Sequence, residues 1–164
     1  MNLNLTSKER ALLEDQKSHE EICIKKYTNY ANQTQCPELK QMFQTFAQQE
    51  QQHLNTINSM LSGKIPNVQQ NQQKNQQQSQ QQNQQQAQSV QGQRGSGMTN
   101  VQDADLCTDM LMTEKYVSDT YDTAVFEFKD TNARQILNHI QKEEQQHGEG
   151  IFNYMQKKGM YQPK

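Results

Sequence analysis

Six acidic and imidazole side chains occur in this sequence at a spacing that suits the binding of two metal ions. The motif Glu-x-x-His occurs twice, and a further glutamate lies 30 residues before each copy. On an α-helix, residues three apart lie on one face, so each motif presents a carboxylate and an imidazole together. Two such motifs, with one glutamate from each of two other helices, make the ligand set of a dimetal-carboxylate site in a helical bundle. The candidate metal ligands are Glu20, Glu50, His53, Glu114, Glu144 and His147.

The ligand types favour particular metals. Carboxylate oxygens with one imidazole per ion suit Fe(II) or Mn(II), and the absence of cysteine from these positions argues against a zinc-finger type of site. The expected cofactor is therefore a pair of Fe or Mn ions. Two alternatives to a metal site stay open. The six residues can form a metal-free network of buried Glu-His hydrogen bonds, or the helix faces can be assigned wrongly, so that these residues do not point inward together. Tyr27 and Tyr121 lie seven residues beyond Glu20 and Glu114. They can donate hydrogen bonds to the ligands or simply fill the core.

An internal repeat relates the two sets of ligands. The halves of the chain align without a gap at an offset of 94 residues, so that Glu20 corresponds to Glu114 and His53 to His147. The densest match is QEQQH at 49–53 against EEQQH at 143–147. Each half therefore supplies the same three candidate ligands.

Each half of the repeat is predicted to form a helical hairpin. Thr6 with Glu9 has capping-box spacing, Pro37 suits a first helical turn, and Gly63 lies where a helix would stop. Asp130 or Thr131 can cap the fourth helix. The inward faces follow steps of three and four, and strand-like alternation is missing. These faces comprise Leu13, Glu20, Ile24, Tyr27 and Ala31; Leu39, Phe43, Phe46, Glu50, His53, Ile57 and Met60; Cys107, Leu111, Glu114, Tyr121, Val125 and Phe128; and Ala133, Leu137, Ile140, Glu144, His147, Ile151 and Tyr154.

The six candidate ligands thus occupy positions that otherwise hold apolar residues. A buried carboxylate costs several kcal/mol unless it is compensated, so four at one level require cations or protons. The predicted fold is all-α, a four-helix bundle built from two repeated hairpins. Several other titratable residues fall off the inward faces and are expected on the solvated surface. They are His19, Glu21, His139, Glu143 and Glu149.

A glutamine-rich tract separates the two hairpins. The 25 positions from Gln69 to Gln93 hold 16 Gln and 3 Asn. The predicted organisation is an N-terminal hairpin at 1–63, a disordered linker at 64–98 and a C-terminal hairpin at 99–164, which together form one bundle. A coil of this length can serve as a long crossover between parallel second and third helices. It can equally join hairpins that pair in another way, and glutamine-rich sequence also tends to self-associate.

Composition excludes several classes of function. The net charge of -2 and pI near 6.1 leave no basic stripe for nucleic acid. No window approaches the roughly 18 apolar residues of a membrane span. The start, MNLNLTSKER, lacks the apolar core of a secretory signal, so we expect the protein to stay on the side of the membrane where it is made. Three cysteines at no metal or disulfide spacing are expected to be reduced thiols. The sequence leaves open whether the chain forms a homo-oligomer.

The C-terminal hairpin resembles a known family. The run from Asp109 to Met155 contains DMLMTEKY and ARQILNHIQKEEQQHG, and GMY follows it. These motifs closely resemble the coat F domain of endospore-forming bacteria, the family of spore coat protein F. More distantly, the Glu plus Glu-x-x-His pattern of both hairpins is similar to the ferritin-like superfamily, which includes rubrerythrins and manganese catalases. The further ligand glutamate of rubrerythrins is missing here, because that position is Val117.

The resemblance implies a spore coat component that is made in the mother-cell cytoplasm during sporulation, lies in the spore coat and associates with other coat proteins. It implies a ferritin-like bundle and the same six metal ligands, and it names no reaction. The alternative is a dimetal-carboxylate oxidoreductase of catalase or oxidase type, with Fe or Mn. The sequence does not decide whether the chain is an enzyme.

Overall fold

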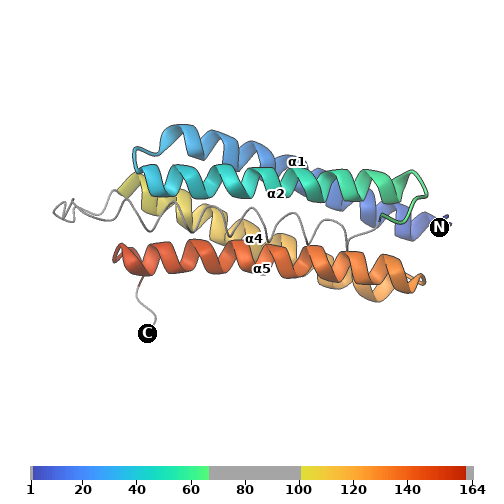
Figure 1. The fold of residues 1–164 in the computed structure, drawn as a ribbon. Helices are drawn as coiled ribbons and strands as arrows, with labels where there is room; N and C mark the ends of the chain where they lie inside the picture. Colours follow the sequence, from blue (N-terminus) through green and yellow to red (C-terminus); the bar gives the residue numbers. More distant parts are fainter. Residues whose placement is uncertain (1, 67–100, 162–164) are drawn as a thin grey trace, which may run out of the picture. The chain divides into compact units, whose positions relative to one another are not determined.

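The computed structural model describes residues 2–66 and 101–161. Their secondary structure consists of four α-helices, α1 (Ser7–Gln33), α2 (Pro37–Leu61), α4 (Val101–Glu127) and α5 (Thr131–Lys157) (Figure 1). No strand occurs in these residues, where an isolated bridge pairs Asn2 with Lys64. The prediction of an all-α chain with four helices is therefore confirmed for the part that the structure describes.

The helix ends follow local sequence signals. Thr6 caps α1, because its hydroxyl accepts the Glu9 N–H at 3.2 Å while the Glu9 carboxylate accepts the Thr6 N–H at 2.7 Å. Pro37 is the first residue of α2. Asp130 caps α5 by accepting the N–H groups of residues 132 and 133. Gly63 follows the end of α2 with φ of 79°, a conformation that glycine adopts without strain.

Neighbouring helices in the bundle are antiparallel. Three residues join α1 to α2 and three join α4 to α5, so each pair turns back on itself. Lys8 pairs with Glu127 and Lys26 with Asp109, which shows that α1 and α4 run in opposite directions. α5 likewise packs antiparallel against α2. The diagonal helices α2 and α4 consequently run in the same direction (Figure 1). None of the helices in the described part of the chain combines the length and apolar character that a membrane span requires.

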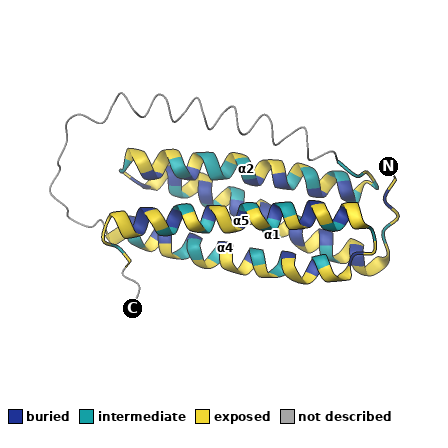
Figure 2. Ribbon diagram, turned by 60° about the horizontal axis from the view of Figure 1, so that its bottom comes forward, coloured by how far each residue is buried: buried dark blue, intermediate teal, exposed yellow. Residues whose placement is uncertain are grey.

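The core consists of apolar clusters at the two ends of the bundle, with a polar layer between them. Buried positions recur along each helix and are separated by exposed ones (Figure 2). One cluster lies where α2 and α4 begin and is built around aromatic and aliphatic side chains. Burying each large apolar side chain stabilises the fold by roughly 1.5–3 kcal/mol. This cluster comprises Tyr27, Ala31, Leu39, Phe43, Leu106, Cys107, Met110, Ile151, Tyr154 and Met155.

Most of the predicted inward positions are buried. All seven predicted for α5 are buried, and six of the seven for α2, where Phe46 is partly exposed. In α1, Cys23 rather than Ile24 is buried. In α4, Leu111 and Val125 are partly exposed, and Met110 and Ala124 are buried instead. The errors have one cause: steps of three and of four both fit a period of 3.6, so adjacent residues compete for the same face.

The predicted glutamine-rich linker lies, from residue 67 to its end, outside the described residues. The structure therefore does not test its role as a crossover or the boundaries at 1–63, 64–98 and 99–164. The geometric requirement for a long connection is nevertheless present, since α2 and α4 run in the same direction (Figure 1).

Candidate metal centre

The six candidate ligands lie in one buried layer halfway along the bundle. Each of the four helices contributes one glutamate, at its midpoint or at the position next to it. The two histidines follow three residues later on α2 and α5. No member of the layer is more than 3% exposed. The structure thus brings together all six residues that the sequence pattern singles out.

The ligand atoms form two overlapping sets of four. The N-terminal site comprises Glu20, Glu50, His53 and Glu144, and the C-terminal site comprises Glu50, Glu114, Glu144 and His147. Within each set the ligand atoms lie within 4.8 Å of one another. Glu50 and Glu144 belong to both sets, so these two carboxylates would help to hold both ions of a bound pair. The donors are hard oxygens with one imidazole per site, which fits Fe(II) or Mn(II).

Four carboxylate oxygens in this layer lack a hydrogen-bond partner. They are Oε2 of Glu20, Oε2 of Glu114 and both oxygens of Glu144. Each lies 2.9–3.7 Å from the Nδ1 atom of a histidine, without hydrogen-bond geometry. A buried polar atom without a partner costs about 1–3 kcal/mol, and more when it is charged. Cations between these oxygens would remove that cost.

Two buried tyrosines bond to the layer from the opposite hairpin. The Tyr27 hydroxyl on α1 donates to Glu114 on α4, and the Tyr121 hydroxyl on α4 donates to Glu20 on α1. Of the two roles expected for these tyrosines, the structure therefore shows the hydrogen bond to a candidate ligand. Burial, together with the nearby carboxylates, raises the pKa of both phenols well above its usual value, so both remain donors.

The outer nitrogen of each histidine meets an oxygen atom. His53 Nε2 lies 2.9 Å from a carboxylate oxygen of Glu143, and His147 Nε2 lies 3.0 Å from the amide oxygen of Gln49. An oxygen acceptor keeps the ring proton on Nε2, and Nδ1 is then free to bind a metal. In both rings Nδ1 faces the carboxylates, at 3.2 Å from Glu50 for His53 and 3.1 Å for His147.

The expectation that off-face residues are solvated is wrong for Glu143. Its side chain is only 18% exposed, and it contacts His53 directly and His139 at 3.4 Å. His19 and His139 are partly buried, whereas Glu21 and Glu149 are exposed as expected. Glu143 was missed because helical periodicity assigns it to a different face from Glu144. The available signal was the repeat, which places Gln49 and Glu143 at one equivalent position.

Burial raises the pKa of Glu20 and Glu114 well above the usual value of 4.5, and the charge of Glu144 acts in the same direction. Burial also acts upward on Glu50 and Glu144, but interactions with the two histidines outweigh it and lower both pKa values. These opposite shifts favour the protonated form of Glu20 and Glu114 and the ionised form of Glu50 and Glu144 in the metal-free protein.

The two histidines complete the charge balance. Burial alone would lower the pKa of His53 and His147, but contacts with the carboxylates raise it well above 6.5 in each ring. Two imidazolium ions then neutralise the two ionised carboxylates. Two divalent cations would likewise neutralise four ionised carboxylates with both imidazoles neutral. The layer is therefore charge-balanced with four protons or with two divalent metal ions.

Aromatic contacts fix the position of the His147 ring. Its centroid lies 4.5 Å from that of Phe46 on α2 and 5.8 Å from that of His53. Phe46 fits there because α5 has a glycine opposite it: a Cβ atom on Gly150 would lie 2.8 Å from Phe46 Cζ. The absence of a side chain at Gly150 thus lets the Phe46 ring lie against α5, where it contacts the His147 imidazole.

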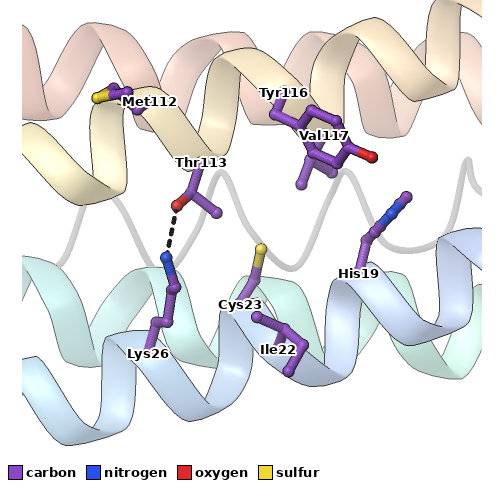
Figure 3. Close-up of a pocket in the computed structure, with 8 residues that line it drawn as sticks. All are labelled: His19, Ile22, Cys23, Lys26, Met112, Thr113, Tyr116 and Val117. Carbon is purple, nitrogen blue, oxygen red and sulfur yellow. Dashed lines mark hydrogen bonds between the residues drawn. The ribbon is translucent and has the colours of Figure 1, made fainter.

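A pocket of about 300 Å³ opens between α1 and α4 beside this layer (Figure 3). Its wall includes Cys23 and Val117, which follow Glu20 and Glu114 by three residues and occupy one equivalent position in the repeat. Lys26 donates a hydrogen bond to Thr113 at 3.0 Å across the same wall (Figure 3). None of the six candidate ligands lines this pocket.

Residues 102–164, which include α5 and nearly all of α4, match the model of the Coat F domain family. This part of the chain is similar to the Coat F domain. The sequence-based identification of that family is therefore confirmed. The match covers well under half of the chain, and it includes Glu114, Glu144 and His147 but not the candidate ligands of the N-terminal hairpin. No curated protein and no solved structure gives a significant match to the chain.

The Coat F domain implies a protein of the spore coat that associates with other coat proteins. It implies nothing about a metal or a reaction.

Proposed function

We propose that this chain is a spore coat component made in the mother-cell cytoplasm, whose ferritin-like four-helix bundle holds a dinuclear Fe or Mn site. The Coat F domain supports the coat role. The observation that carries the metal site is the convergence of four buried glutamates and two histidines, one glutamate from each helix, with four carboxylate oxygens unpartnered. The antiparallel ring of α1, α2, α5 and α4 supports the ferritin-like arrangement.

The metal has a structural role in this proposal. Each site draws its ligands from both hairpins, because Glu144 completes the N-terminal site and Glu50 completes the C-terminal site. Bound ions would therefore link the two hairpins at mid-height, and their binding free energy would add to folding stability. When bound, such a dinuclear centre also supplies Lewis-acid and redox chemistry.

The test is the metal content of the full-length protein produced with iron or manganese supplied. We expect close to two ions per chain in the wild type and a large loss in the double variant Glu50→Ala/Glu144→Ala, with helicity retained. The matched control is Glu21→Ala/Glu149→Ala, which removes one exposed acid from each half of the chain and should keep the metal. A wild-type content near zero after supply of both metals refutes the metal centre.

Removal of the metal tests its structural role. An ion at a free concentration of 100 times its Kd stabilises the folded state by about 2.7 kcal/mol. We therefore expect chelation to lower the unfolding temperature by several degrees in the wild type and by far less in the double variant. Sustained consumption of peroxide or dioxygen by the loaded protein would instead support the oxidoreductase alternative. Nothing in the described residues or in the family match favours that alternative.

The coat role has a separate test. Fractionation of purified spores should find the chain in the coat extract, and a fluorescent fusion should appear in the mother cell before it surrounds the forespore. Recovery of the chain entirely in the soluble forespore fraction would refute the coat role and leave the metal centre untouched.

A further inference from the structure

The two metal sites differ at one polar position. Residues 49 and 143 are equivalent in the repeat, and each directly precedes a Glu-x-x-His motif. The chain has Gln49 at one and Glu143 at the other. The other pairs that form or hydrogen-bond the layer are identical, since glutamate corresponds to glutamate, histidine to histidine and Tyr27 to Tyr121.

Both contacts cross between the hairpins. Glu143 on α5 bonds the Nε2 atom of His53 on α2, and Gln49 on α2 bonds the Nε2 atom of His147 on α5. The distances, 2.9 and 3.0 Å, are nearly equal. The two imidazoles therefore have the same outer geometry but different partners, a carboxylate for one and a neutral amide for the other.

A carboxylate that accepts the outer N–H of a ligand imidazole makes the metal-facing nitrogen more basic, and loss of such a partner typically costs about 10- to 100-fold in metal affinity. A neutral amide orients the ring with a smaller effect on its basicity. We infer that Glu143 gives the N-terminal site the higher metal affinity of the two, so that the first metal ion binds at the site with Glu20 and His53. This inference rests on the proposed dinuclear centre. Glu143 is a positioning residue, because it acts through the imidazole that it contacts.

The test is titration of the full-length, metal-free protein with Mn(II) alone, with free Mn(II) followed by electron paramagnetic resonance. Glu143→Gln should weaken the first binding step by about 10- to 100-fold. Gln49→Glu should strengthen the second step, a gain that a merely structural role would not produce. The matched controls, Glu149→Gln and Gln48→Glu, make the same charge changes at exposed positions of α5 and α2 and should leave both steps unchanged.

Variants of the histidines locate the tight step. His147→Ala should retain it, and His53→Ala should lose it. Circular dichroism of each variant confirms that the helices are intact. Two bound Mn(II) ions in the wild type, with neither Glu143→Gln nor Gln49→Glu changing either step, overturn this inference and leave the metal centre standing. Failure of the wild type to take up Mn(II) or Fe(II) overturns the metal centre and this inference with it.

Discussion

The three cysteines have different surroundings, and these determine which thiol can react. Cys23 and Cys107 have no exposed surface, whereas Cys36, at the start of α2, is partly exposed. Burial raises the pKa of Cys107 to about 12. Burial and the nearby glutamates raise the pKa of Cys23 far above its usual value. Because the thiolate is the reactive form, neither buried cysteine is expected to react in the folded protein.

We therefore predict that a thiol reagent at neutral pH labels Cys36 alone, and that the other two cysteines react only after unfolding. Cys23 is the informative case, because it forms part of the pocket wall between α1 and α4 (Figure 3). Peptide mapping after brief labelling identifies the modified residue, and Cys36→Ser should abolish the fast reaction. Rapid modification of Cys23 would show that reagents reach the interior through this pocket.

At the scale of the helices, Glu9 ties the start of α1 to the connection between α4 and α5, at one end of the bundle. It is 2% exposed, and its carboxylate accepts the Lys129 N–H in the connection between α4 and α5 at 2.9 Å. The same carboxylate accepts the Thr6 N–H at the start of α1. Burial alone would raise the pKa of Glu9, but these hydrogen bonds outweigh it and lower the pKa below 4.5.

Glu9→Ala removes the acceptor of two part-buried hydrogen bonds, each of which contributes about 0.5–1.5 kcal/mol to stability. We predict a loss of stability in that range or above, measured by urea denaturation at pH 7. Because the folded pKa is lowered, the contribution of Glu9 is present above pH 4.5 and is lost as the pH falls through the folded value. The difference between wild type and variant should shrink accordingly in acid. The control Glu14→Ala, at an exposed position of α1, should change stability by less than about 0.5 kcal/mol.

The sequence was sufficient for the parts of the fold that depend on local signals. The cap at Thr6, the first turn at Pro37 and the cap at Asp130 depend on residues within a few positions of one another. The repeat also identified the six inward candidate ligands, because coincidence at two equivalent positions is rare. The bond from Glu9 to Lys129 spans 120 residues and has no local signal. The contact between Glu143 and His53 likewise depends on how α5 packs against α2.

For the molecule as a whole, the metal-free layer makes stability depend on pH in both directions. His53 and His147 have raised pKa values in the folded state, so their contribution is full below pH 6.5 and declines as the pH rises. Glu20 and Glu114 also have raised pKa values in the folded state, so they too reduce the stability of the folded protein as the pH rises above 4.5. Glu50 and Glu144, whose pKa values are lowered, contribute above pH 4.5 and lose this contribution in acid.

The chelated protein is therefore predicted to be most stable near pH 4.5 and to lose stability from there toward pH 9, most steeply above pH 6.5, because the unfolded chain then releases protons that four groups of the folded layer retain. Urea denaturation in the presence of a chelator measures this directly. The double variant Glu20→Gln/Glu114→Gln is the control. It should lose less stability on the alkaline side, because glutamine does not titrate and only the two histidines then retain protons on folding. With Mn(II) present the alkaline loss should disappear, since rising pH helps the metal replace the protons. A metal-free protein that grows more stable from pH 6.5 to 9 would contradict the charge balance derived for the layer.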